Sequence, residues 1–303
     1  MKRTLPIIII TLLMMSGCRY SFELSDIGLE PRLCVRSFVC ADSSVTVTVH
    51  RAIPITDAAN NDTSRISPMF SLKCNGSEVE GSQSDIDRGG VQYNMEAFEP
   101  GDILELSVED EGMDRVTAST VIPDFFPKCT TEFSTLDQWN RSVSIKYEDN
   151  PESDDFYGAV VMSTTTNVET GHEWSGSYHP VGGYDSINID YSAYSPIVTQ
   201  LDGEHLFIWK DTDEEDNEYE LKYVLDGMSG ENYRKFIYLK LFKMSEEMYR
   251  TLYAWYDQSN NMFTYIGFFS PSACYTNINN GICYFGSYSV RYTEPVEITN
   301  EIK

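Results

Sequence analysis

From residue 33 onward, the chain shows the hydrophobic pattern of short β-strands. Leu33–Val39 is rich in strand-forming residues, and Val45–Val49 alternates valine with threonine. Turn residues such as Asn75-Gly76 separate later runs of the same kind. Those runs are 70–74, 77–79, 103–108 and 115–121. Short strands that alternate with turns predict an immunoglobulin-like β-sandwich over residues 31–122.

The second half of the chain predicts further strands and one helix. Pro123 and Pro127 interrupt the strand pattern, so residues 123–128 are predicted to be a linker. Ser245 is a suitable N-cap for a helix that ends near Asn260. The predicted strands are 143–147, 157–163, 205–209, 219–225 and 236–242. We therefore expect an all-β protein in which residues 129–303 form a larger β-rich domain with one α-helix.

The N-terminus has the pattern of a secretion signal. Lys2 and Arg3 precede an apolar run from Leu5 to Met15, which is too short to span a membrane. The Ser-Gly-Cys ending resembles a bacterial lipobox. It predicts a signal peptide over residues 1–17, lipidation of Cys18 and a tether over residues 18–30. An ordinary signal peptide followed by a chance cysteine is the alternative interpretation.

The charge of the chain restricts the classes of molecule that it can bind. The chain has 22 basic and 47 acidic residues, and its formal net charge is −25. Such a surface repels phosphate backbones, so a nucleic-acid partner is excluded. The same acidity disfavours binding flat on anionic lipid, and we expect membrane attachment through acyl chains.

The cysteines predict no metal or redox motif. Besides Cys18 there are six: Cys34, Cys40, Cys74, Cys129, Cys274 and Cys283. No CxxC spacing occurs among them, and Cys34 and Cys40 are too far apart on one strand to pair. Cys274 and Cys283 flank an Asn-Gly turn and are a candidate disulfide, with buried free thiols as the alternative.

No local motif indicates catalysis or a cofactor. GxSxG, HExxH, GxGxxG and Walker A patterns do not occur. We expect no catalytic residues, although a Ser-His-Asp arrangement built from distant residues stays open.

An acidic run at residues 211–218 is a candidate calcium loop. Asp211, Asp213 and Glu215 match the start of an EF-hand loop, but Asp216 and Lys222 stand where glycine and glutamate are needed. A solvated hairpin tip is the favoured interpretation, and the three acidic residues are kept as calcium candidates.

An aromatic segment is a candidate contact region. Glycine and serine separate its rings, which is typical of adaptable binding loops. The favoured alternative is that the rings cover a sheet. The candidate contacts for a ligand or partner are Trp174, Tyr178, Tyr184, Tyr191 and Tyr194.

A C-terminal motif resembles a known family. Phe269–Pro271 is followed by Thr276–Ser289, which contains an Asn-Ile step, a glycine turn and a closing Phe-Gly-x-Tyr-Ser. With the lipobox, this order resembles the Bacteroidota outer-membrane lipoproteins grouped as domain of unknown function 4249. Cys283 stands where that family usually has glycine. A structural turn and last strand is the favoured interpretation of the motif, and a ligand-contacting loop is the alternative.

The resemblance implies an outer-membrane location and a receptor partner, because genes of this family commonly lie beside TonB-dependent receptors. We expect a non-enzymatic, lipid-anchored accessory subunit that binds an unknown small ligand for a nutrient or metallophore uptake receptor. A structural or adhesive cell-surface lipoprotein is the alternative, and an extracytoplasmic hydrolase is the second alternative. Whether the protein faces the periplasm or the cell surface is left open.

Overall fold

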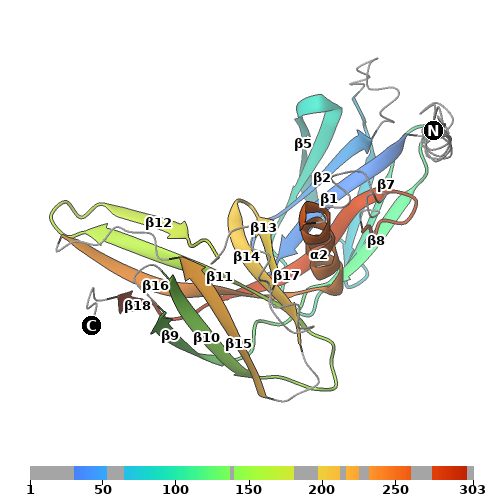
Figure 1. Cartoon of the computed structure of the whole chain (residues 1–303). Helices are drawn as coiled ribbons and strands as arrows, with labels where there is room; N and C mark the ends of the chain where they lie inside the picture. The colour runs from blue at the N-terminus through green and yellow to red at the C-terminus, as the bar shows by residue number, and fades with distance from the viewer. Residues whose placement is uncertain are drawn as a thin grey trace, which may run out of the picture. The chain divides into compact units, whose positions relative to one another are not determined.

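The computed structural model describes residues 31–52, 65–136, 140–180, 197–211, 216–224, 232–260 and 275–298 (Figure 1). The predicted signal peptide, Cys18 and the tether lie outside these residues. No helix in the described ranges is long and apolar enough to cross a membrane.

The first half of the chain forms short antiparallel strands. In chain order they are β1 (Arg32–Cys40), β2 (Val45–Ala52), β3 (Met69–Cys74), β4 (Ser77–Glu78), β5 (Gly81–Ile86), β6 (Gly90–Met95), β7 (Ile103–Glu109) and β8 (Val116–Val121), with the 3-10 turn η3 (Asp87–Gly89) before β6.

The second half adds longer strands and a helix. They are β9 (Cys129–Thr135), β10 (Asn140–Glu148), β11 (Phe156–Asn167), β12 (Glu173–Ser177), β13 (Ile197–Leu201), β14 (Glu204–Lys210), β15 (Asp216–Val224), β16 (Tyr233–Met244), α2 (Glu246–Asn260), β17 (Ile282–Tyr292) and β18 (Val296–Ile298).

The predicted immunoglobulin-like sandwich is present. One of its sheets has the order β4-β3-β7-β8, and the other contains β1-β2-β6-β5. Val45, Val47 and Val49 of β2 are buried, while the threonines between them are more exposed. These valines share one hydrophobic core with Leu72 and Leu104 of the opposite sheet. The period-two pattern of the sequence therefore gives the sandwich its inner face.

A second sandwich follows. The three-stranded sheet β15-β10-β9 shares a core with one face of β11, β14 and β16. Tyr157 and Val161 of β11 point into this core, whereas Val160 points to the other face, where it belongs to a core with Met248 and Leu252 of α2. Because both of its faces are covered, β11 is buried without interruption from Tyr157 to Val161.

The predicted helix is confirmed. The Ser245 side chain accepts a hydrogen bond from the Met248 backbone N–H at 3.3 Å, as an N-cap does. The same hydroxyl oxygen accepts the Ser287 backbone N–H of β17 at 3.1 Å. A Cβ on Gly286 would lie 2.9 Å from the Met248 backbone nitrogen, so only glycine allows β17 to approach the helix this closely.

Strands from the two halves of the chain share one sheet. β1 pairs in parallel with β17, which in turn pairs with β16. Ile122 is buried in the first core and Phe126 in the second, so the predicted linker passes from one core to the other. The division into domains at residues 123–128 stays a prediction.

The disulfide of the structure corrects the candidate pair from the sequence. Cys283 is bonded to Cys34, with a Cα–Cα distance of 5.4 Å, and Cys274 lies outside the described residues. The reason is tertiary: Cys34 lies on β1, and β1 is the neighbour of β17 in the sheet. Cys283 has a φ of 80°, a backbone conformation that favours glycine.

Candidate functional site

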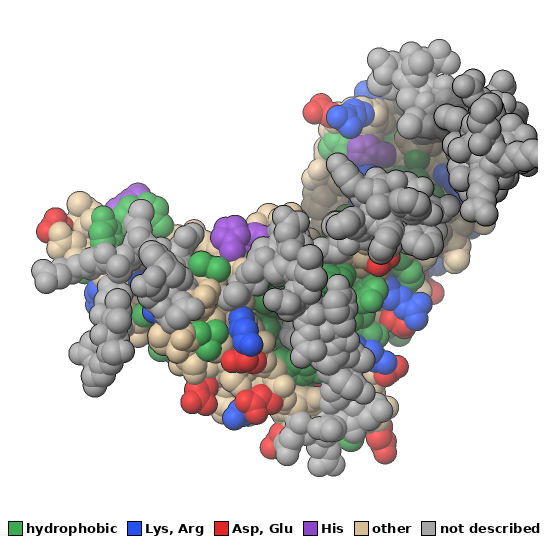
Figure 2. All heavy atoms as spheres, in the orientation of Figure 1, with side chains coloured by type: hydrophobic (Ala, Val, Ile, Leu, Met, Phe, Trp, Pro, Cys, Tyr) green, Lys and Arg blue, Asp and Glu red, His purple; other side chains and the backbone are tan. Residues whose placement is uncertain are grey.

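The β11–β12 hairpin presents an exposed aromatic side chain. Trp174 of β12 is 40% exposed. The His172 ring meets it edge-on at a centroid distance of 4.5 Å, and the Tyr233 ring lies 6.0 Å away. Figure 2 shows histidine and hydrophobic side chains together at the upper left, where β12 lies in Figure 1. We call His172, Trp174 and Tyr233 the aromatic patch.

β12 is an edge strand within the described part of the chain. It pairs there with β11 alone. Its residues Glu173–Ser177 are almost all exposed. A Cβ on Gly176 would meet no atom within 4 Å, so the strand surface is open at this point.

Tyr178 is a core residue, which corrects its prediction as a contact. Its side chain is 3% exposed, and its ring lies 5.3 Å from that of Tyr223. The Lys235 ammonium lies 5.2 Å from the Tyr178 ring centroid. The physical reason is that β12 ends at Ser177, after which the Tyr178 backbone N–H donates to the Val161 carbonyl and the ring enters the second core. The other predicted contacts, Tyr184, Tyr191 and Tyr194, lie outside the described residues.

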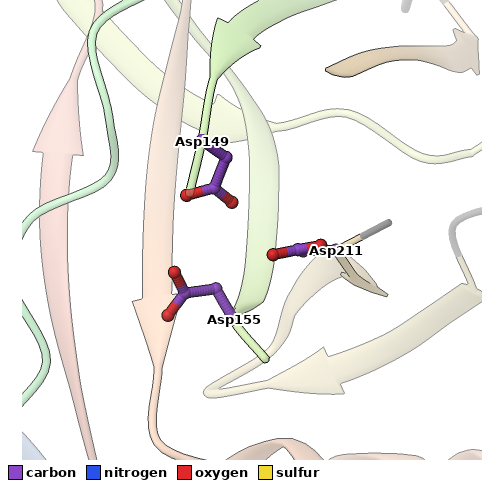
Figure 3. Close-up of side chains that lie close together, drawn as sticks. All are labelled: Asp149, Asp155 and Asp211. Carbon is purple, nitrogen blue, oxygen red and sulfur yellow. The ribbon is translucent and has the colours of Figure 1, made fainter. Parts of the chain in front are cut away.

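The acidic run contributes one residue to a cluster that the sequence did not predict. Asp149, Asp155 and Asp211 each offer a carboxylate oxygen, and these oxygens all lie within 4.8 Å of one another (Figure 3). We call these residues the aspartate cluster. The other calcium candidates, Asp213 and Glu215, lie outside the described residues.

The fold explains why the three aspartates meet. Asp149 follows β10, and Asp155 directly precedes β11. Asp211 follows β14, whose Lys210 is opposite Phe156 of β11. The Asp211 backbone N–H donates to the Asp155 carbonyl at 3.0 Å, so the antiparallel pairing continues one residue beyond the strands.

Donors surround two of the three carboxylates. The Tyr157 hydroxyl donates to Asp149 Oδ2 at 2.5 Å. The Lys243 ammonium and the Ser153 hydroxyl donate to Asp155 Oδ2 at 2.9 and 3.1 Å. In contrast, Asp211 Oδ2 is buried and has no hydrogen-bond partner among the described residues.

The electrostatics of the cluster oppose full ionisation. Burial, followed by repulsion from Asp149, raises the pKa of Asp211 to about 7. Two negative charges at this spacing repel by on the order of 3 kcal/mol at an effective dielectric constant near 20. Burial and the hydrogen bond to Asp149 also raise the pKa of Tyr157, which keeps this hydroxyl protonated as a donor.

Sequence reasoning missed Asp149 and Asp155 because their partner is distant in the chain. The available signal was local: Asp149 and Asp155 flank the Asn150-Pro151 turn between two predicted strands. The approach of Asp211 depends on the pairing of β11 with β14, which no local pattern encodes.

The C-terminal motif has structural partners. The Asn277 side chain donates to the Phe285 carbonyl at 2.6 Å and accepts from the Phe285 N–H at 3.0 Å. The Asn280 side chain donates to the Arg115 carbonyl at 3.2 Å. A Cβ on Gly281 would lie 2.6 Å from Ile278 Cγ2. These contacts fix the turn before β17 and leave both asparagine side chains engaged.

Comparisons with known proteins give no functional relative. No protein-family model matches the chain, and no curated protein matches it. A solved structure titled "Anomalous substructure of Titin-A168169" is 9% identical, covers 71% of this chain and 91% of that chain, and has a TM-score of 0.23. The Yersinia pseudotuberculosis adhesin InvE is 13% identical, with coverage of 75% of this chain and 58% of that chain and a TM-score of 0.22. Neither similarity carries an argument about fold or function.

Proposed function

We propose that this chain is a non-enzymatic outer-membrane lipoprotein, anchored through Cys18, that acts as an accessory ligand-binding subunit of a TonB-dependent uptake receptor. The lipobox-like N-terminus and the family resemblance of the C-terminal motif support the location and the partner. The exposed Trp174 on the edge strand β12 is the observation that carries the binding role.

Trp174 has the properties of an interface anchor. A tryptophan ring that a partner covers removes a large apolar area from water, at about 25 cal/mol per Å². Tryptophan is accordingly enriched among the residues that dominate binding energy. The neighbouring rings of His172 and Tyr233 restrict the positions open to the Trp174 ring, so less side-chain freedom remains to be lost on binding.

The strand beside the ring supports the same role. The outer edge of β12 has backbone groups that can pair with an extended segment of a partner. Ser175, Gly176 and Ser177 are small, so another backbone can approach. An edge strand next to an aromatic anchor combines backbone hydrogen bonding with one side-chain contact.

The first prediction tests this surface. Full-length tagged protein extracted in mild detergent should co-purify a TonB-dependent receptor, identified by mass spectrometry. Trp174→Ala should lower the recovered receptor several-fold, because an aromatic anchor is lost. Its melting temperature should stay close to that of the wild type, since the ring is 40% exposed.

Tyr253→Ala is the matched control, because Tyr253 is 48% exposed on α2 and lies outside the aromatic patch. This variant should recover as much receptor as the wild type. Equal recovery with Trp174→Ala would place the interface elsewhere. A wild-type protein that never recovers a receptor would make the structural or adhesive alternative the better account.

A further inference from the structure

The aspartate cluster carries more negative charge than its surroundings neutralise. Three carboxylates lie together, and among the described residues one ammonium, that of Lys243, contacts them through Asp155. Full ionisation of the three aspartates therefore leaves a net charge of −2 at one point between β10, β11 and β14. Such a site gains stability from a positive charge.

A separate observation shows where that charge is missing. Asp211 is 8% exposed, and its Oδ2 is buried without a donor among the described residues. Tyr157, Ser153 and Lys243 all donate to Asp149 or Asp155. In Figure 3, the Asp211 carboxylate points between those of Asp149 and Asp155. A buried acceptor aimed at two other carboxylates requires a proton or a cation.

We infer that the aspartate cluster is a calcium-binding site in which Asp149, Asp155 and Asp211 are the protein ligands. Calcium binds oxygen ligands at about 2.3–2.6 Å, so oxygens on opposite sides of the ion lie about 5 Å apart. The carboxylate oxygens of the cluster lie within 4.8 Å of one another, which is compatible with an ion between them.

The chemistry of the site favours calcium over other divalent ions. Zinc prefers histidine nitrogen and cysteine sulfur, and the cluster offers only carboxylate oxygen. Magnesium requires near-ideal octahedral geometry and keeps most of its water. Asp149 and Asp155 are half-buried, so water can complete the larger and less regular coordination shell of calcium.

Calcium would tie three element ends together. The ion would join the end of β10 in the three-stranded sheet to the ends of β11 and β14 in the large sheet. Because the ligands come from both layers of the second sandwich, binding should stabilise the folded chain, and this stabilisation should increase with the logarithm of the ion concentration once the site is saturated. This inference does not depend on the proposed receptor partner.

The second prediction is a calcium titration of the full-length protein in detergent, after chelator treatment and dialysis at pH 7.5. Isothermal titration calorimetry should give one site with a half-saturation between about 1 µM and 1 mM. The melting temperature should rise by at least about 2 °C in 5 mM calcium chloride. Magnesium chloride at the same ionic strength should give a clearly smaller rise.

Single substitutions test whether the calcium response comes from the aspartate cluster. Asp211→Asn should abolish the calorimetric signal and the calcium-dependent rise, and Asp149→Asn is a second ligand variant should the first fail to fold. Asp154→Asn is the matched control, because its side chain is 73% exposed and pairs with Lys210 instead of the cluster. It should keep the full response.

Three outcomes would overturn the inference. The first is a wild-type protein with neither calorimetric heat nor a rise in melting temperature. The second is a calcium response that persists in a folded Asp211→Asn variant. The third is an equal response to magnesium, which would overturn the assignment to calcium.

Discussion

At the scale of single residues, the position of Asp211 depends on a contact that its own sequence neighbourhood does not reveal. It begins an acidic run that is typical of a solvated hairpin tip, yet it is 8% exposed. The cause is the pairing of β14 with β11, which places Asp211 beside Asp155. A buried carboxyl with a raised pKa makes the stability of the protein depend on pH in a specific direction.

The third prediction follows from the pKa of Asp211, which is raised to about 7 in the folded protein. An aspartate in the unfolded chain has a pKa near 3.9. Between these values the folded state binds more protons than the unfolded state. The contribution of protonated Asp211 to the free energy of unfolding is therefore fully present below about pH 4. It is lost as the pH rises to about 7.

Urea unfolding of calcium-free protein at several pH values checks this sign. Relative to the wild type, Asp211→Asn should become progressively more stable between pH 4 and pH 7, by up to about 1.4 kcal/mol per pH unit. Titrating groups that do not interact with Asp211 cancel in the difference between the two proteins, so the difference reports Asp211 together with its acidic neighbours Asp149 and Asp155. A difference that does not change with pH would show that Asp211 ionises normally in the folded state.

Trp174 and Tyr178 show a second limit of prediction from the local sequence pattern. A period of two places these residues on the same face of a continuous strand. β12 ends at Ser177, however, so Trp174 is exposed and Tyr178 is buried. Composition left a contact surface and a sheet-covering role open as alternatives for this segment. For Trp174 and Tyr178, the end of the strand decides which ring faces water.

At the scale of elements, local periodicity predicted the strands with clear alternation and the helix. β2, β7, β11, β14 and β16 all contain their predicted runs, and α2 starts directly after the predicted Ser245 cap. The strand β9 was missed because its sequence, with threonine, glutamate and serine, has few apolar positions. Its place is set by pairing with β10, whose side chains fill the second core.

The fourth prediction concerns the contact between β17 and α2. A Cβ at residue 286 would lie 2.9 Å from the Met248 nitrogen and 3.1 Å from its Cα. Both are backbone atoms of a capped helix, so they cannot move aside without displacing the element. Gly286→Ala should therefore lower the free energy of unfolding by about 1–3 kcal/mol in urea denaturation.

Gly176→Ala is the matched control for this substitution. Gly176 also lies in a strand, but a Cβ there would meet no atom within 4 Å. Its effect should stay within about 0.5 kcal/mol of zero. Equal effects of the two substitutions would mean that Gly286 is not a point of close approach.

At the scale of the whole molecule, the ends of the described chain are joined. β1 pairs in parallel with β17, and Cys34 is bonded to Cys283 across a sequence separation of 249 residues. The sequence predicted two consecutive β-rich regions, which follow from local patterns. It could not predict this closure, because a parallel pair between distant strands and one disulfide among 15 pairings of six cysteines leave no local signal.

The fifth prediction tests the closure directly. A protease site inserted after Pro127 would allow the chain to be cut between the two cysteines of the disulfide. In denaturing electrophoresis without reductant, the cut protein should migrate as one species, because Cys34 and Cys283 hold the two fragments together. With reductant, it should separate into an N-terminal and a larger C-terminal fragment.

The paired substitution Cys34→Ser and Cys283→Ser is the control, and it should separate without reductant. Separation of the cut wild-type chain under non-reducing conditions would contradict the assigned disulfide. A cut paired variant that still migrates as one species would indicate a different bridge among Cys40, Cys74, Cys129 and Cys274.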